Sequence, residues 1–140
     1  MTFISYLLGL AVGTSGTKSV LFAETGVPAA SFTSEYPFEQ PKPGWAEQDS
    51  ERWWQAAVES ISAVLAKSGV DAGEIAGIGL SGQMHSLVCL DADGRVLRKA
   101  ILWCDQRTAA AERARFGGRC SRIFSAKQSQ QPTLRRGPPL

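Results

Sequence analysis

The stretch LGLAVGTSGTK, residues 8–18, decides the fold that we expect for this chain. It ends the apolar run from Phe3 to Val12 and passes into a turn rich in glycine and hydroxyl side chains. A second strand is predicted from Lys18 to Phe22, and a third from Val27 to Tyr36. Short turns between such segments are typical of antiparallel strands. The sequence therefore predicts a β-meander at the start of the chain.

A helix is predicted from Asp49 to Lys67, after a loop rich in proline. Asp49 suits the N-cap, and Gly69 suits the C-terminal end. The apolar face is predicted from residues that recur at helical spacing, namely Trp54, Ala57 or Val58, Ile61, and Val64 or Leu65.

Shorter elements are expected after the helix. Strands are predicted at 75–80 and 85–90, turns at 81–83 and 91–94, an apolar segment at 100–103 and a second helix from Thr108 to Ala114. The resulting β-β-β-α-β order indicates an α/β fold with a mixed sheet.

The composition is that of a globular protein, with 140 residues and a formal net charge of +2. The cysteines Cys89, Cys104 and Cys120 are odd in number and show no C-x-x-C spacing. This argues against a disulfide framework or a zinc ribbon and suits a reducing cytoplasm. Cys89 and Cys104 are expected to be small buried residues.

The charge is divided unevenly along the chain. Residues 1–112 hold 8 Lys or Arg and 13 Asp or Glu, whereas residues 113–140 hold 7 Lys or Arg and no acid. We expect 113–140 to be a basic, disordered tail, because it lacks the apolar residues needed for folding. A shifted reading frame would produce such a change. Nucleic-acid binding is the weaker interpretation, because only Phe116 and Phe124 accompany the charges.

The apolar N-terminal run suits a strand better than a targeting or membrane segment. The first basic residue is Lys18, so the charged start of a signal peptide is missing. The run is also too short to cross a bilayer, which takes roughly 20 apolar residues.

The turn at residues 13–19 invites comparison with a P-loop. A Walker A motif would need glycine at the positions of Val12 and Thr17, so the match fails. A glycine hairpin can still present backbone N–H groups to phosphate oxygens. An ordinary hairpin turn is the alternative.

Four segments together resemble the FGGY carbohydrate kinases, and its xylulokinase branch in particular. They are LGLAVGTSGTK (8–18), PGWAEQD (43–49) followed by two tryptophans, IGLSGQMH (78–85) and AILWCDQRT (100–108). The resemblance covers residues 7–112. It implies an incomplete first domain of the ribonuclease-H/actin-like ATPase fold over 1–112, and a family that phosphorylates D-xylulose with ATP and Mg²⁺. Glycerol, gluconate or ribulose are the alternative substrates, and a non-enzymatic binding module using the basic tail is the alternative function.

The resemblance also implies roles for individual residues. It implies that the sugar is contacted by Met84, His85 and Asp105. Gln83 and Trp103 would support the pocket. Thr14, Ser15 and Lys18 would lie near the ATP phosphates. Structural alternatives exist for several of these residues: His85 as a structural histidine, Asp105 as an N-cap, Met84 and Trp103 as core.

Two departures from the family lead us to expect an inactive chain. Ala11 stands where the family has an Asp that helps to hold magnesium, and a methyl group cannot bind a hard cation. The resemblance also implies a general base and an adenosine site further along than this chain reaches. We therefore expect no metal site and no complete catalytic centre in these 140 residues.

Overall fold

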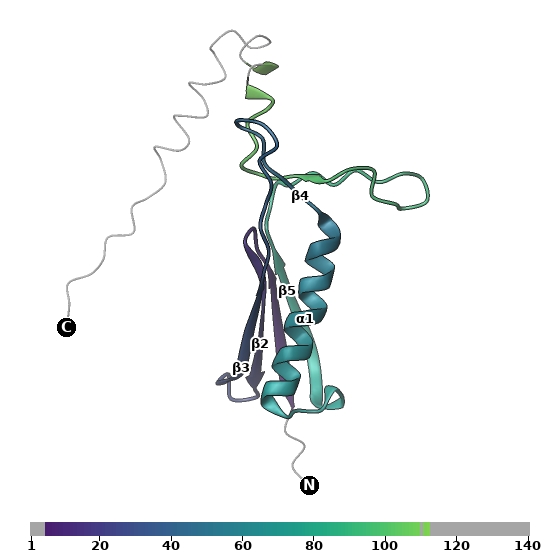
Figure 1. The fold of residues 1–140 in the computed structure, drawn as a ribbon. Coiled ribbons are helices and arrows are strands. Elements are labelled where there is room, and N and C mark those ends of the chain that lie inside the picture. The colour runs from purple at the N-terminus through teal and green to yellow at the C-terminus, as the bar shows by residue number, and fades with distance from the viewer. Residues whose placement is uncertain (1–4, 110, 113–140) are drawn as a thin grey trace, which may run out of the picture. The chain divides into compact units, whose positions relative to one another are not determined.

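The computed structural model describes residues 5–109, 111 and 112. Its elements, shown in Figure 1, are β1 (Tyr6–Val12), β2 (Gly16–Ala23), β3 (Pro28–Glu35), β4 (Glu47–Gln48), α1 (Ser50–Ser68), the short 3₁₀ helix η1 (Ala72–Glu74), β5 (Ile75–Gly82) and β6 (Ala100–Ile101). The predicted β-β-β-α-β order is therefore confirmed for the main elements.

The principal sheet has the strand order β3-β2-β1-β5. The first three strands form the predicted antiparallel meander. β5 runs parallel to β1, because the chain returns through α1 to the same edge from which it started. The sheet is thus mixed, as predicted, and β4 and β6 form a separate two-stranded ribbon.

Two turns show why glycine is required in the meander. The N–H of Gly13 donates to the carbonyl of Gly16 at 2.9 Å and closes the turn that carries Thr14 and Ser15. A Cβ at Gly16 would lie 2.8 Å from the carbonyl oxygen of Ser34, so only glycine lets β2 start beside β3. Gly26 has a φ of 82°, which is the left-handed conformation that favours glycine.

The core lies between the sheet and α1, which packs on β2 and β3. Its buried centre is formed by Leu8, Leu21, Ala30 and Val64. Both predicted caps of α1 are confirmed, since Asp49 accepts from the N–H of Glu51 at 3.0 Å and Gly69 ends the helix at a φ of 70°.

The predicted apolar face of α1 is wrong at its start. Trp54 is 68% exposed, and the buried residues of the helix are Ala56, Ala57, Ser60 and Val64. Small side chains allow the helix to approach β2 closely enough for the Ser60 and Ser19 hydroxyls to bond at 2.8 Å. A bulky indole in that position would hold the two elements apart.

Residues 85–90 do not form the predicted strand. Only isolated bridges join Leu87 to Ile101 and Leu90 to Val96. A strand-like sequence pattern is not enough to form a strand here, because a strand also needs a continuous neighbouring strand to pair with its backbone groups. The predicted turn at 91–94 is confirmed, with the Gly94 N–H bonded to the Asp91 carbonyl at 3.1 Å.

Three further predictions agree with the structure only in part. The predicted turn at 81–83 is wrong for Ser81 and Gly82, which continue β5. Cys89 and Cys104 are free and half-buried rather than buried. Thr108 begins a helical turn, in which the Glu112 N–H donates to its carbonyl at 2.9 Å.

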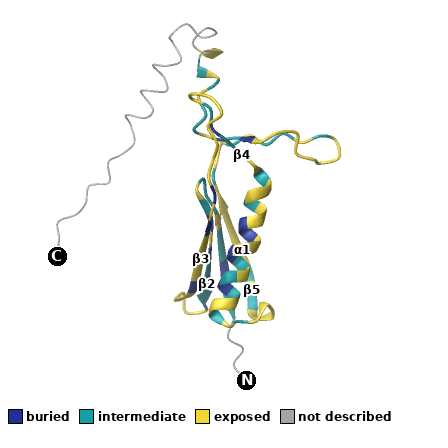
Figure 2. Ribbon diagram, in the orientation of Figure 1, coloured by how far each residue is buried: buried dark blue, intermediate teal, exposed yellow. Residues whose placement is uncertain are grey.

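The outer strand β5 is the least covered part of the sheet. Figure 2 shows most of it exposed, and Ile78 and Leu80 are 65% and 74% exposed. The described residues up to Asp105 form one compact unit. The basic tail predicted at 113–140, with Cys120, lies outside the described residues. No helix in the described part of the chain is long and apolar enough to span a membrane.

Candidate functional site

The candidate site is built around the turn between β1 and β2. The end of β5 lies beside this turn, because the Gln83 N–H donates to the Val12 carbonyl at 2.8 Å. The pairing continues the parallel register of β1 and β5 by one residue. Two segments that the sequence placed in separate binding roles therefore meet at one end of the sheet.

The Thr14 hydroxyl joins three of the predicted site residues. It donates to Gln83 Oε1 at 3.0 Å and accepts from Trp103 Nε1 at 3.1 Å. The partners come from positions 69 and 89 residues away in the chain. Thr14, Gln83 and Trp103 thus form one hydrogen-bonded group, in which the hydroxyl of Thr14 holds the turn rather than pointing freely to solvent.

Gln48 is a site residue that sequence reasoning missed. It is 1% exposed, and its Nε2 donates to the Thr14 carbonyl at 3.0 Å and to the Pro37 carbonyl at 3.1 Å. Its Oε1 accepts from Trp53 Nε1 at 2.6 Å and from Gln83 Nε2 at 3.4 Å. Gln48 stands inside the quoted PGWAEQD segment, but nothing in its spacing distinguishes it from a solvated polar residue.

Tyr36 supports the same turn and was also missed. Its hydroxyl donates to the Gly13 carbonyl at 2.8 Å and lies 3.0 Å from the Thr17 hydroxyl, which therefore donates to it. Its side chain is buried, with 3% of the residue exposed. Burial raises the pKa of Tyr36, and the hydrogen bond from Thr17 opposes that shift.

The raised pKa of Tyr36 predicts a loss of stability at high pH. Above the ordinary tyrosine pKa of about 10, the unfolded chain loses this proton before the folded chain does. The unfolded state then binds fewer protons, so the free energy of unfolding falls as the pH rises through that range. Urea unfolding between pH 8 and 11 should show a steeper decline for the natural chain than for Tyr36→Phe. Parallel declines would contradict the assignment.

A groove of about 380 Å³ runs along the open side of the turn. Its lining residues are Ala11, Val12, Gly13, Gly16, Lys18, Ser81, Gly82 and Gln83. Lys18 is exposed and lies directly opposite Ala11 across the β1–β2 pair. Ser15 is exposed at the tip of the turn, where its carbonyl accepts from the Tyr36 N–H at 3.1 Å.

The donor set of this groove fits an anion better than a metal ion. Its only charged lining residue is Lys18, and no carboxylate contributes to it. Within the described residues, no three His, Cys, Asp or Glu side chains gather in a way that could hold a metal. Ala11 lines the groove with a methyl group, whereas Mg²⁺ requires oxygen ligands.

Met84 and His85 follow Gln83 on an exposed segment. Met84 is 72% exposed, so the alternative of a core methionine is wrong. His85 is exposed and has a φ of 60°. Every other described residue with a positive φ is a glycine. An L-residue in this region is strained, and such strain is concentrated at functional sites.

The backbone of His85 predicts a difference between two substitutions. His85→Gly and His85→Ala both remove the imidazole, but only glycine adopts a φ of 60° without strain. We expect the glycine variant to be more stable than the alanine variant by about 1 kcal/mol. Urea unfolding measures the difference. Equal stabilities would show that the positive φ is absent in solution.

The remaining predicted sugar contact, Asp105, lies beside the loop that leads into β4. Its Oδ2 accepts from the Ala46 N–H at 2.6 Å, which fixes the orientation of the carboxylate. Trp103 is 58% exposed, so the core alternative is wrong for it as well. Asp105 therefore bonds to the loop before β4, whereas Trp103 bonds to Thr14 in the turn.

Comparison with known proteins decides the family. Residues 6–118 match the N-terminal domain of the FGGY family of carbohydrate kinases. The chain belongs to this family. The FGGY match includes every helix and strand from β1 to β6. It extends six residues past the boundary expected at residue 112.

Named relatives of this FGGY chain include sugar kinases of more than one specificity. The xylulose kinase of Bacillus subtilis is 44% identical over 105 residues, which is 75% of this chain and 21% of that protein. A xyloylose kinase from Brucella ovis has a similar structure, with a TM-score of 0.74 and 41% identity over 86% of this chain and 25% of that one. The structure of gluconate kinase from Lactobacillus acidophilus is also similar, with a TM-score of 0.75. Its sequence identity is 36%, and the match covers 87% of this chain and 24% of that one.

These comparisons fix the fold and the extent of the match. The architecture is that of the FGGY sugar kinases, the actin-like ATPase fold, and the mixed sheet with its helix is part of one domain. The chain spans about a fifth of the length of the curated relatives that it matches.

Proposed function

We propose that this chain is the N-terminal part of a xylulokinase-type sugar kinase and that residues 1–112 form its partial domain. The observation that carries the proposal is the convergence of Thr14, Gln83 and Trp103 at one end of the sheet. Exposed Met84 and His85 follow this group directly and offer an apolar surface next to a hydrogen-bonding side chain. Such a combination suits a sugar. We place the protein in the cytoplasm.

The nucleotide part of the proposal rests on the groove beside the turn. Lys18 and the backbone of Gly13 and Gly16 would face the ATP phosphates, where positioning and charge compensation drive phosphoryl transfer. ATP supplies the transferred phosphoryl group when it is bound. Lys18 compensates negative charge, and the turn fixes the position of the phosphates. Because no carboxylate lines the groove, we propose that the 140-residue chain alone does not phosphorylate the sugar.

Titration with sugars tests the binding half of the proposal. The exposed indole of Trp103 lies in the site, so bound sugar should change its fluorescence. We expect D-xylulose to produce a saturable change that Trp103→Phe abolishes. Gluconate or glycerol saturating at lower concentration than D-xylulose would replace the proposed substrate, and no response to any sugar would contradict the sugar site.

An assay of ATP consumption coupled to D-xylulose tests the proposed inactivity. We expect no turnover above background for the purified chain. Reproducible turnover that requires both substrates would overturn this part of the proposal.

A further inference from the structure

We propose that Gln48 is a positioning residue, which holds the phosphate-facing turn and the sugar-facing segment in one geometry. The inference rests on the proposed function, since it assigns Gln48 to that same site. Gln48 touches neither predicted ligand position directly. It acts through Thr14 on one side and Gln83 on the other.

The bonding of Gln48 uses the whole capacity of an amide side chain. Such a group has two N–H donors and two acceptor positions. Here Nε2 donates hydrogen bonds to the carbonyls of Thr14 and Pro37. Oε1 accepts hydrogen bonds from the side chains of Trp53 and Gln83. A carboxylate could not donate to the two carbonyls, and an apolar side chain could make none of the four contacts.

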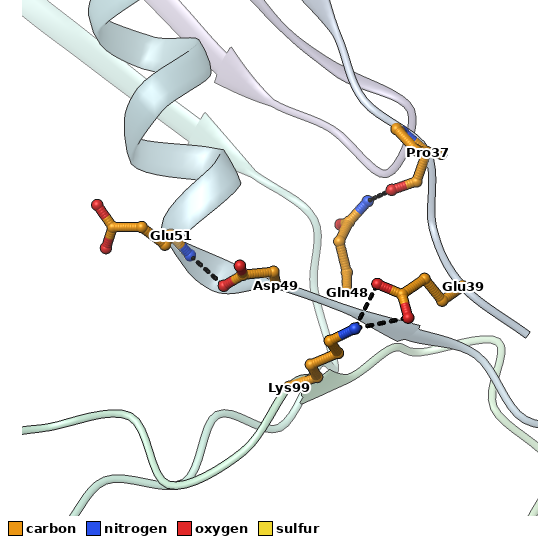
Figure 3. A network of polar contacts seen from close by, with 6 residues as sticks. All are labelled: Pro37, Glu39, Gln48, Asp49, Glu51 and Lys99. Carbon is orange, nitrogen blue, oxygen red and sulfur yellow. Dashed lines mark hydrogen bonds and ion pairs between the residues drawn. The ribbon is translucent and has the colours of Figure 1, made fainter. Parts of the chain in front are cut away.

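The segments joined in this way belong to separate parts of the chain. Thr14 lies in the turn after β1, and Pro37 follows β3. Trp53 lies in the first turn of α1, and Gln83 directly follows β5. Figure 3 shows the Gln48 amide directed at Pro37, next to the capped start of α1. Without Gln48, the turn and the end of β5 would keep their backbone pairing but lose the shared buried support of their polar groups.

Gln48 is itself held rigidly. It is 1% exposed and lies in β4, where its backbone pairs with Ala100 of β6. The neighbouring Asp49 caps α1. The ion pair between Lys99 and Glu39, seen in Figure 3, lies across the same ribbon. A positioning residue needs such a base, because its own movement would pass directly to the groups that it orients.

A two-step path leads from Gln48 to Trp103. Gln48 bonds the Thr14 carbonyl and the Gln83 side chain, and the Thr14 hydroxyl bonds both Gln83 and the Trp103 indole. The Trp103 indole bonds to the Thr14 hydroxyl, so it reports the geometry of the turn. This gives the proposal a spectroscopic readout that does not depend on sugar binding.

The test compares Gln48→Met with Ser60→Ala in the 140-residue chain. Methionine keeps the length of the side chain but makes none of the four bonds. Ser60 is also fully buried and hydrogen-bonded, to Ser19 and to the Ala57 carbonyl, but lies away from the turn. The two variants therefore both lose buried hydrogen bonds. Gln48→Glu is a second variant, which keeps an acceptor for Trp53 and serves if the methionine variant does not fold.

The first readout is the indole N–H resonance of Trp103, assigned with Trp103→Phe. We expect it to shift and exchange faster with solvent in the Gln48 variants and to stay in place in Ser60→Ala. An unchanged Trp103 resonance in a folded Gln48 variant would overturn the proposal, and so would an equal change in Ser60→Ala.

The second readout is the affinity for D-xylulose below the unfolding transition. We expect the Gln48 variants to bind at least about tenfold more weakly, because binding sites are sensitive to small displacements. Ser60→Ala should bind like the natural chain. Unaltered affinity in a folded Gln48 variant would contradict the positioning role. If the natural chain binds no sugar, the proposed function fails, and the Trp103 resonance decides on Gln48 separately.

Discussion

A chimaera carrying residues 6–112 of this chain, joined to the rest of the Bacillus subtilis xylulose kinase, is expected to gain activity when Ala11 is changed to Asp. The chain is 44% identical to that kinase over the matched 105 residues, so the replaced segment should pack on the remainder. We expect the rate with D-xylulose to rise by a factor on the order of 100 or more. Even the loss of a residue that only hydrogen-bonds to a metal ligand lowers metal affinity or activity roughly 10–100-fold.

The groove explains the size of this effect. Ala11 is exposed at the end of β1, in the lining of the groove and directly opposite Lys18. A carboxylate at this position would give the groove its first oxygen ligand for Mg²⁺, which favours carboxylates. It would also lie across from a cation, so its charge would be compensated when no metal is bound.

The matched control is Ala11→Asn in the same chimaera. Asparagine has the shape of aspartate but no charge, so steric effects of the larger side chain would appear in both variants. We expect the asparagine variant to stay near the low rate of Ala11. A chimaera that is fully active with Ala11 would show that the missing carboxylate does not limit the reaction.

The substitution Leu21→Ala is expected to remove a large part of the stability of the described domain. Leu21 has no exposed surface and packs in the core cluster with Leu8, Ala30 and Val64. Truncating a buried leucine costs about 2–5 kcal/mol, through lost transfer energy and the cavity left behind. The whole stability of a small domain is about 5–15 kcal/mol. Urea unfolding followed by circular dichroism measures the loss.

Leu97→Ala is the control for this prediction. Leu97 is 64% exposed, so the same chemical change removes little buried surface. We expect its effect to stay within about 0.5 kcal/mol. Similar losses for both variants would mean that β2 does not pack against α1 in solution as the structure describes.

Local sequence signals predicted the elements whose causes lie within a few residues. The meander follows from apolar runs separated by glycine turns, and Gly16 is required where β2 starts beside Ser34. The helix follows from its capping residues, since Asp49 and Gly69 satisfy backbone groups next to them. The family resemblance rested on four short segments, and the match over residues 6–118 confirms it.

Other features depended on partners that are distant in sequence. Trp54 fits the helical spacing of an apolar face, but the sheet meets the side that carries Ala57 and Ser60. Residues 85–90 have a strand-like pattern without a continuous neighbour to pair with. The sequence offered no means of knowing which surface would face each of them.

By itself, the sequence determined the fold family and the order of strands and helix. Only the tertiary structure decided that Thr14, Gln83 and Trp103 form one group, and that Gln48 is buried among them. The reason is physical. Turns, caps and apolar periodicity act between near neighbours in the chain, whereas a buried amide is satisfied only by donors and acceptors that folding brings together.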